Sequence, residues 1–318
     1  MRQYQYRDRS LHGKDTGAIH GIVEKLSDLV SAHPGYVPIA LWDDRCGWRE
    51  ALLPRYKRHR WETPEQVAFL ECYLWQVDVV RELLQHLGLP QSFCPGFEAD
   101  DVVGAICRGA DPSWQIRLAT TDTDWFQALR SNVEWHSVST GRTITHEDLP
   151  NPDRVAGGPF ASVEHYVQAK ALAGDPSDGI PGVAGVGIKT AARIIREYGS
   201  VEALWARHDA GESIRGVVVQ RAAGAEHRNT YRRNLQLIDW RLAPVLGDDV
   251  QLDAGKTDHS RAAQVCSHWG LPESTIRSLS TASENFASTI RGVQEILCPG
   301  SAELGWLPAR RDRCNEPP

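Results

Sequence analysis

The chain lacks the features that would mark a membrane protein, a disulfide-rich secreted protein or a zinc protein. None of its apolar runs approaches the about 20 residues that cross a bilayer, and no signal peptide is visible. Its seven cysteines are scattered and form no Cys-x-x-Cys pair, which argues against both a disulfide framework and a zinc site. We therefore expect a reduced cytoplasmic protein with buried or inert thiols.

The chain also lacks an excess of positive charge. It has 35 Lys and Arg against 41 Asp and Glu, a net charge of −6, which at first argues against nucleic acid as a partner. However, eight of the carboxylates are candidate metal ligands, and removing their charge turns −6 into +2. Because local charge matters more than the total for phosphate binding, nucleic acid stays a candidate. With 318 residues, 41% of them hydrophobic, the chain has room for a large α/β domain and a smaller helical lobe.

Apolar runs alternate with helical patterns in the first half of the chain. The runs predict strands over 37–42 and 115–120 and a hairpin of 133–138 with 142–145. A capping-box pattern at Thr63 predicts a helix from Pro64 to about His86, and a second helix is expected over 98–108. This alternation is typical of an α/β fold with a mostly parallel central sheet flanked by helices.

From about residue 162 the pattern becomes helical. Helices are expected over 162–173, 189–198, 201–207 and 228–237, with one or two short ones within 258–280. We therefore divide the chain into a core over 1–161, with a basic region at 49–88, and a helical lobe over 162–280. Residues 281–318 are expected to form a poorly ordered tail, because the periodicity weakens there and the end is polar.

Carboxylates stand where an α/β sheet holds its ligands. Asp43 follows one predicted strand, and Asp122 and Asp124 follow another, at the edge where open parallel sheets bind ligands. At a spacing of two, Asp122 and Asp124 point the same way if the extended geometry persists. Each of them alone is equally typical of a turn or a helix cap, so both interpretations stay open.

Two further acidic groups open or precede helical segments. Glu98 and Asp101 are three apart and would share a helix face, whereas Asp100 lies off it and would act at longer range through water. Asp175 and Asp178 precede a Gly-rich loop. Capping alone would explain either group, but clustered carboxylates need compensating cations. Hard oxygen ligands of this kind suit Mg²⁺ or Mn²⁺.

The Gly-rich loop carries Gly182, Gly185 and Gly187 and runs into the helical segment Lys189–Tyr198. Closely spaced glycines let the backbone approach a phosphate, and a helix start turns free N–H groups toward it. Carboxylates beside a phosphate repel it unless a metal ion lies between them. The stretch therefore indicates metal-assisted chemistry on a phosphodiester, or binding of one, and Arg193 on the helix is either a further phosphate contact or a plain surface charge.

The densest basic run extends from Arg49 to Arg60 and follows the first predicted strand, so we expect it near Asp43. Lys57 and Arg60 are three apart and would share a face if this segment is helical. The run is either a phosphate clamp over a metal site or a solvated charged loop.

Five groups of residues form a specific combination. In chain order they are Trp42-Asp43 with Trp48-Arg49 and Tyr56-Lys57-Arg58-His59-Arg60; Gly96-Phe97-Glu98-Ala99-Asp100-Asp101; Thr121-Asp122-Thr123-Asp124-Trp125; Ala171-Leu172-Ala173-Gly174-Asp175-Pro176-Ser177-Asp178-Gly179-Ile180-Pro181-Gly182-Val183; and Gly185-Val186-Gly187-Ile188-Lys189-Thr190-Ala191. In order, spacing and residue type, residues 2–245 resemble the 5′-nuclease family. These are the flap endonucleases and 5′→3′ exonucleases of bacteriophages and of the N-terminal part of bacterial DNA polymerase I.

The resemblance implies a PIN-like 5′-nuclease core and a helix–hairpin–helix at 174–198. It implies two Mg²⁺ (or Mn²⁺) ions held by Asp43, Glu98, Asp100, Asp101, Asp122, Asp124, Asp175 and Asp178. K⁺ is a further ion expected at the helix–hairpin–helix. Lys57 and Arg60 would act in catalysis where the 5′ strand enters. DNA contacts would come from Arg49, Tyr56, Arg58, Gly182, Gly185, Gly187, Lys189, Thr190 and Arg193.

The function that the resemblance implies is two-metal hydrolysis of DNA phosphodiesters near 5′ ends, in replication or repair. The expected partner is branched or nicked duplex DNA with a 5′ end, and the expected protein is a phage-encoded monomer of the bacterial or host cytoplasm. Two alternatives stay open: a DNA-binding homologue without activity, and a ribonuclease that removes RNA primers from RNA–DNA.

One departure from the family concerns the start of the chain. Family members begin with a strand that ends in Val-Asp-Gly, whose Asp is a central metal ligand. Arg2 matches the Arg shortly after that Asp, so we expect the first strand and its carboxylate to be absent from the sequence as written. A start assigned too far downstream is the favoured explanation, and a truncated or degenerate protein is the alternative.

Overall fold

The computed structural model describes residues 9–246, 250–280 and 287–297. The described chain forms two compact units, each with its own core. Unit 1 comprises residues up to 45, 60–106 and those from 246 onward, and unit 2 comprises 46–59 and 107–245. The division predicted at residues 161 and 162 groups the chain differently and stays a prediction. None of the described helices is long and apolar enough to cross a membrane.

Unit 1 contains a three-stranded sheet in the order β10-β4-β3. Strand β3 (Ala40–Trp42) pairs in parallel with β4 (Gln91–Phe93), and β10 (Gln251–Asp253) pairs with β4 in antiparallel. All three residues of β4 are buried although two of them are polar. The Gln91 carboxamide oxygen accepts a hydrogen bond from the Trp42 indole at 2.9 Å, and the Ser92 hydroxyl donates to the Gln251 carbonyl at 2.9 Å. These bonds satisfy the buried polar groups.

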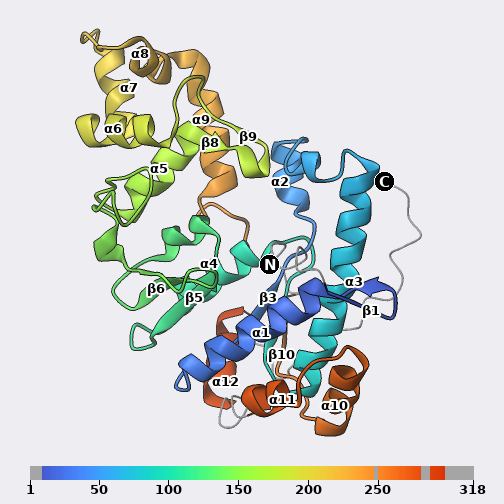
Figure 1. The fold of residues 1–318 in the computed structure, drawn as a ribbon. Helices are drawn as coiled ribbons and strands as arrows, with labels where there is room; N and C mark the ends of the chain where they lie inside the picture. The colour runs from blue at the N-terminus through green and yellow to red at the C-terminus, as the bar shows by residue number, and fades with distance from the viewer. Residues whose placement is uncertain (1–8, 247–249, 281–286, 298–318) are drawn as a thin grey trace. The chain divides into compact units, whose positions relative to one another are not determined.

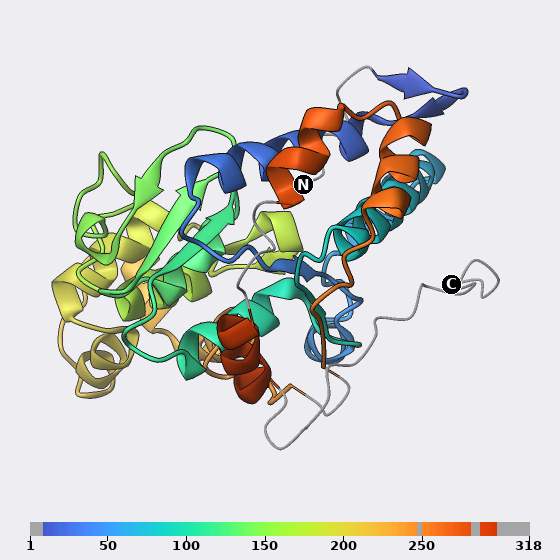
Figure 2. The ribbon, with the colours of Figure 1, turned by 90° about the horizontal axis from the view of Figure 1, so that it is seen from below.

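Helices cover this sheet. Helix α1 (Gly17–Ala32) packs against α3 (Pro64–His86) and α11 (Glu273–Ser280), and α10 (His259–His268) packs against α3 (Figures 1 and 2). A short hairpin of β1 (Ser10–Leu11) with β2 (Lys14–Asp15) precedes α1. The capping box at Thr63 is confirmed, because its hydroxyl accepts from the Gln66 amide at 3.3 Å and its amide donates to the Gln66 side chain at 3.0 Å.

The predicted tail of residues 281–318 falls largely outside the described residues, but its described part is not irregular. Residues Ala287–Leu297 form helix α12, which lies against β10. Ile290, Val293 and Leu297 are buried on one face of it. The expectation of a poorly ordered tail was wrong here, because these three residues follow a helical period that packs on the sheet.

Unit 2 contains the second three-stranded sheet, in the order β5-β6-β7. Strand β5 (Ile116–Thr120) pairs in parallel with β6 (Val133–Ser137), and β6 forms the predicted hairpin with β7 (Thr143–Ile144). Helix α4 (Ala99–Gly109) precedes β5 in the chain. The predicted α/β class is confirmed, and the parallel pairs lie in two separate small sheets.

Helices form most of the rest of unit 2. They are α5 (Val163–Ala173), α6 (Ile188–Tyr198), α7 (Val201–Asp209), α8 (Val217–Ala223) and α9 (Ala225–Ile238), with a short α2 (Gly47–Leu52) packed on α9. Figure 1 shows α5 beside both α6 and α9. Their shared core includes the fully buried Leu172, Ile194 and Tyr231. Between α5 and α6, β8 (Gly174–Asp175) and β9 (Ile180–Pro181) form a hairpin.

The hairpin depends on two glycines that touch through their backbones. A Cβ atom on Gly182 would overlap the Ala173 carbonyl and the Gly174 backbone, whereas a Cβ on Gly187 would meet nothing within 4 Å. Gly174 also has a positive φ of 73°. Gly182 is therefore required for the close approach of β9 to the end of α5.

We predict that Gly182→Ala lowers the free energy of unfolding by about 3 kcal/mol or more, because backbone atoms cannot move aside as a flexible side chain can. Gly187→Ala is the matched control from the same loop, with an expected cost below about 1 kcal/mol. Urea unfolding followed by circular dichroism measures both. Equal losses in the two variants would contradict this account of Gly182.

Candidate functional site

Acidic side chains of unit 2 surround Lys170, a residue of α5. The Lys170 Nζ atom lies 2.6 Å from Asp124 Oδ1 and 2.7 Å from Asp175 Oδ2. Its side chain is 15% exposed, and its neighbours Ala169 and Ala171 are fully buried. The helix therefore places one cation between carboxylates of two other elements: Asp124 belongs to the 3₁₀ turn Thr123–Ala128, and Asp175 ends β8.

The turn after β5 is held against α5 by a further bond. The Tyr166 hydroxyl, one helical turn before Lys170, donates to the Thr123 carbonyl at 2.9 Å. Asp122 caps the turn, and its Oδ1 accepts from the Asp124 amide at 2.8 Å. The extended geometry expected for Asp122 and Asp124 is therefore not present, because the chain bends into the turn directly after Asp122.

The electrostatics of this cluster follow from burial and from Lys170. Burial raises the pKa of Asp124 to about 7; Lys170 opposes the shift, and Asp122 and Asp175 add to it. For Asp175 burial acts in the same direction, but Lys170 and the hydrogen bonds from Ser177 bring its pKa below the usual value. Burial alone would lower the pKa of Lys170, but the carboxylates and Tyr166 raise it above its ordinary value. Lys170 is therefore held in its charged form.

Asp178 is joined to the basic segment before α3. Its Oδ2 lies 3.6 Å from Lys57 Nζ and accepts a hydrogen bond from the Tyr56 hydroxyl at 3.2 Å. The Asp178 carbonyl also accepts from the Lys57 amide at 2.8 Å. These contacts bring Lys57 to the end of the short 3₁₀ turn Pro176–Asp178.

The condition under which Lys57 and Arg60 would share a helix face, a helical segment, is not met. Lys57 has a φ of +52°, in the left-handed region, and a 3₁₀ turn begins only at Arg58. A helix cannot continue through a left-handed residue. The chain instead turns at Lys57, which presents its amide to Asp178.

Two residues expected to contact DNA are buried. Arg49 is 3% exposed; its Nε atom donates to the Leu237 carbonyl at 3.1 Å, and its guanidinium lies 4.3 Å from the centre of the Trp48 ring. Tyr56 is 5% exposed and packs in a cluster with Leu53 and Leu237. Arg49 joins α2 to α9 and Tyr56 packs beside it, so both have structural roles, and the DNA contacts expected of them stay a prediction. The sequence did not distinguish these roles, because arginine and tyrosine also occur buried, with the polar end of the side chain hydrogen-bonded.

The acidic residues of unit 1 cap the start of α4. Asp43 Oδ1, directly after β3, accepts from the Ala99 amide at 2.8 Å, and Asp101 Oδ2 accepts from the Glu98 amide at 3.1 Å. Asp101 is 2% exposed and Glu98 is also buried, whereas Asp43 is exposed and Asp100 is partly exposed. Asp101 therefore caps α4 through one of its oxygens, and the metal role expected for it stays a prediction. Backbone N–H groups at a helix start favour negative charge there.

Among the described residues, no group of three or more Asp, Glu, His or Cys side chains stands close enough to form a ready-made metal site. In unit 2 the Lys170 ammonium lies between Asp124 and Asp175.

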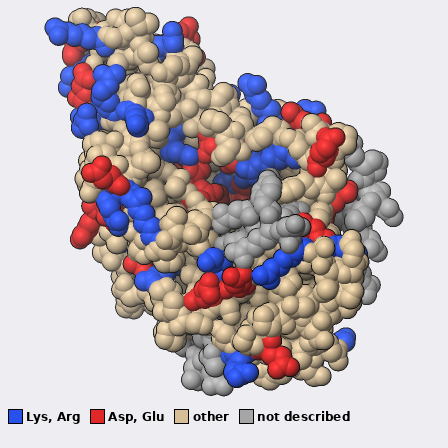
Figure 3. All heavy atoms as spheres, in the orientation of Figure 1, with Lys and Arg blue, Asp and Glu red and all other residues tan. Residues whose placement is uncertain are grey.

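The Gly-rich loop and α6 present an exposed basic surface. Lys189 and Arg193 are exposed, on the side of α6 opposite the buried Ala191, Ile194 and Ile195. Figure 3 shows Lys and Arg side chains over the part of unit 2 that holds α6 and α7.

The glycines of this loop differ in their surroundings. Gly185, with a φ of +81°, and Gly187, which precedes α6 without a side-chain cap, are both exposed. Thr190 is half-buried. Gly182 instead packs against backbone, and the DNA contact expected of it stays a prediction.

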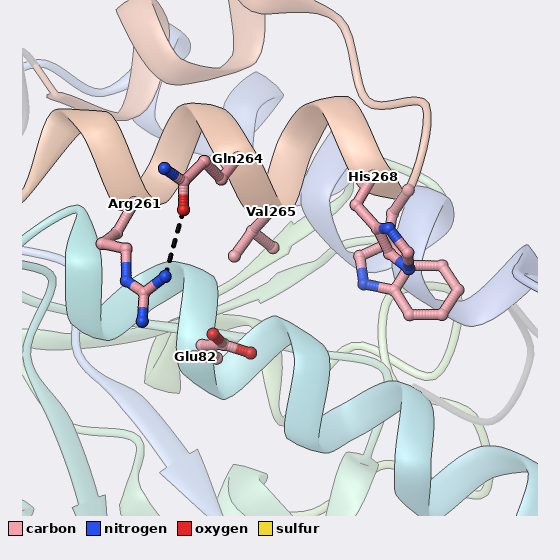
Figure 4. A pocket seen from close by; sticks show the side chains of 6 residues that line it. Glu82, Arg261, Gln264, Val265 and His268 are labelled. Atoms are coloured by element: carbon pink, nitrogen blue, oxygen red, sulfur yellow. Dashed lines mark hydrogen bonds between the residues drawn. The ribbon is translucent and has the colours of Figure 1, made fainter.

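Unit 1 contains a small open pocket between α3 and α10. Glu82, Arg261, Gln264, Val265, His268 and Trp269 line it, and Arg261 Nη1 donates to Gln264 Oε1 at 3.1 Å (Figure 4). None of the candidate site residues contributes to this pocket.

Sequence reasoning missed Lys170 and Ser177. Ser177 donates to Asp175 Oδ1 from its amide at 2.8 Å and from its hydroxyl at 2.6 Å. The signal for Lys170 was present: it is the single lysine of its helix, stands between Ala169 and Ala171, and lies five residues before Asp175. A lysine flanked by buried alanines needs a buried partner.

Comparison with known proteins finds two matching domain families. Residues 2–152 match the 5′-3′ exonuclease N-terminal resolvase-like domain, and residues 161–248 match the 5′-3′ exonuclease C-terminal SAM fold.

Two curated relatives illustrate the sequence similarity. The chain is 33% identical over 201 residues to the thermostable DNA polymerase I of Thermus thermophilus, covering 62% of this chain and 22% of that one. It is 33% identical over 212 residues to a 5′-3′ exonuclease of Mycobacterium tuberculosis, covering 62% and 66% respectively. The chain thus spans about a fifth of the polymerase relatives it matches.

Among solved structures, the fold is similar to the T5 D15 protein co-crystallized with metal ions. The TM-score is 0.61 at 22% identity, covering 88% of this chain and 91% of that one. A second structure, of a bacteriophage T5 flap endonuclease variant in a pseudo-enzyme-product complex with DNA and metal ions, gives 0.60 at 22% identity, covering 87% and 91%.

We predict that Arg49→Ala lowers the free energy of unfolding by about 3 kcal/mol, because it removes a buried charge-assisted hydrogen bond and leaves a cavity under Trp48. Arg58→Ala is the control, an exposed arginine nine residues on, with an expected change within about 0.5 kcal/mol. Chemical denaturation measures both changes, provided that the m-value is the same in the two variants and the unaltered protein. An unaltered denaturation midpoint for Arg49→Ala would contradict the stabilising role assigned to this buried residue.

Proposed function

The chain belongs to the 5′-3′ exonuclease family, and on that premise we propose that it hydrolyses DNA phosphodiesters near 5′ ends with the help of divalent metal ions. The observation that carries the proposal is the convergence of Asp124 and Asp175 oxygens on one cation, the Lys170 ammonium, at 2.6 and 2.7 Å. Carboxylates so placed at the end of β5 and beside a Gly-rich loop suit metal-assisted phosphodiester chemistry.

The donor set fits hard divalent ions. The side chains offer only carboxylate oxygens, which suit Mg²⁺ or Mn²⁺, and two of them already face a positive charge. The proposed ligands are Asp122, Asp124, Asp175 and Asp178 of unit 2 and Asp43, Glu98 and Asp100 of unit 1. The T5 D15 protein, similar in fold, was crystallised with metal ions. Bound metal ions would lower the pKa of an attacking water and stabilise the leaving 3′-oxygen.

The chain's own cations act on the phosphate. Asp178 and the Tyr56 hydroxyl position Lys57, whose ammonium lies 5.0 Å from the centre of the Tyr56 ring. A fixed ammonium of this kind stabilises negative charge as it develops on the phosphate. Arg60, which ends the 3₁₀ turn after Lys57, is proposed to act on the phosphate as well.

The DNA-binding surface is proposed to comprise Arg58, the loop of Gly185 and Gly187, and Lys189, Thr190 and Arg193. The loop and the start of α6 offer backbone N–H groups to a phosphate, with K⁺ as an additional ion. The exposed Lys189 and Arg193 add charge along the same helix. The proposed substrate is branched or nicked duplex DNA with a 5′ end, acted on by a cytoplasmic monomer in replication or repair. Preferential cleavage of a matched RNA–DNA primer substrate would instead favour a ribonuclease that removes RNA primers.

We predict that Asp122→Asn lowers the rate of cleavage of a labelled 5′-flap duplex in Mg²⁺ by at least about 100-fold, because several kcal/mol of metal assistance is lost. The asparagine keeps an oxygen that can accept from the Asp124 amide. Affinity for the duplex should be retained, and EDTA should stop cleavage by the unaltered protein.

Asp111→Asn is the matched control, because Asp111 Oδ1 accepts from the Ser113 amide at the same 2.8 Å in an exposed turn. It should cleave like the unaltered protein. Undiminished cleavage by Asp122→Asn would refute the ligand assignment. Tight binding by the unaltered protein without any cleavage would favour a DNA-binding homologue that lacks activity.

We also predict that Lys189→Ala combined with Arg193→Ala weakens duplex binding and flattens its salt dependence. Each lost phosphate contact should reduce the slope of log K against log salt by about 0.9. Fluorescence anisotropy between about 50 and 200 mM salt measures this. Lys256→Ala, an exposed lysine of unit 1, should leave the slope as it is, and an unaltered slope in the double variant would remove α6 from the interface.

A further inference from the structure

Lys170 is a partly buried cation whose partners are candidate metal ligands. Its ammonium contacts Asp124 Oδ1 at 2.6 Å and Asp175 Oδ2 at 2.7 Å, and both carboxylate side chains are at most 17% exposed. A lysine in such surroundings is stable only when paired, and two carboxylates this close need a cation between them. The contact therefore stabilises the buried lysine and also the two carboxylates.

The arrangement engages both oxygens of Asp175. Oδ2 accepts from Lys170, and Oδ1 accepts from the amide and the hydroxyl of Ser177. A divalent ion that binds Asp175 must therefore compete with one of these donors. Ser177 follows Asp175 in the same turn and is fixed by the backbone, whereas the lysine side chain ends in rotatable bonds, so Lys170 is the donor that can withdraw.

The position of Lys170 is itself fixed by its helix. One turn earlier, the Tyr166 hydroxyl donates to the Thr123 carbonyl, which ties α5 to the segment that carries Asp124. Asp175 follows directly from the end of α5 through Gly174. Because these three elements are held together independently of the ammonium, the carboxylates stay in place when Lys170 withdraws.

We propose that Lys170 is the internal counter-cation of the metal site: it holds Asp124 and Asp175 in the absence of metal and competes with a divalent ion for them. This inference rests on the metal binding in the proposed function. The positive charge of Lys170 weakens binding of a second cation beside it by electrostatic repulsion. It also offsets the repulsion between Asp124 and Asp175 in the metal-free protein.

The test compares Lys170→Met with the unaltered protein, because methionine fills a similar volume without the charge. Isothermal titration with Mg²⁺ alone and Ca²⁺ alone, without DNA, measures affinity. We expect Lys170→Met to bind about 10- to 100-fold more tightly, the range of a changed neighbour of a metal ligand. Its melting temperature should be lower without metal and should rise more on addition of metal than that of the unaltered protein.

Lys25→Met is the control, since Lys25 pairs with Asp28 at 3.3 Å on α1 and should alter neither affinity nor the metal-induced shift. Metal affinity that is equal or lower in Lys170→Met, with normal binding by the unaltered protein, would overturn the inference and leave the proposed function standing. Absence of metal binding in both proteins would instead overturn the metal assignment of the proposed function and the inference with it.

A second measurement needs no variant. In a crystal structure of the unaltered protein soaked in Mn²⁺, the distance of 2.6 Å between Lys170 Nζ and Asp124 Oδ1 should lengthen beyond hydrogen-bond reach, or the contact of 2.7 Å with Asp175 should do so. A structure with Mn²⁺ on these carboxylates and both lysine contacts intact would contradict the inference, even if Lys170→Met fails to fold.

Discussion

Compensation of negative charge around Asp124 and Asp175 is the constraint on which the middle of unit 2 depends. Two carboxylates of low exposure repel each other, and burial disfavours their charged forms. Lys170 compensates their charge from α5 by contacting both carboxylates. The close contact of Gly174 with Gly182 returns the chain tightly past the end of α5, next to Asp175.

The carboxylates of unit 1 are neutralised in a different way. Asp43 and Asp101 accept hydrogen bonds from backbone amides at the start of α4, at 2.8 and 3.1 Å, where the helix presents a partial positive charge. The protein therefore uses a side-chain cation in one unit and a helix terminus in the other. Both devices place positive charge, full or partial, beside acidic side chains.

The sequence predicted elements wherever a local signal was strong. The capping box at Thr63 and the helical periods of α5, α6 and α9 were sufficient to place those helices. It did not predict β4, because Gln91 and Ser92 look like loop residues until their partners Trp42 and Gln251 are known. The sequence also did not distinguish buried from exposed arginines within the basic run. Arg49 and Arg58 look alike in sequence, but only Arg49 has a carbonyl from α9 to satisfy it.

The sequence by itself determined which residue types stand at the ends of strands and at the starts of helices, because turn chemistry, capping and hydrophobic period act over a few neighbouring residues. It therefore supplied the acidic motifs and the family they belong to. Only the tertiary structure decided which of these carboxylates face a cation and which cap a helix, and which arginine is buried. Those outcomes depend on contacts between residues far apart in the chain, such as Asp124 with Lys170 or Arg49 with Leu237. No local pattern specifies such contacts.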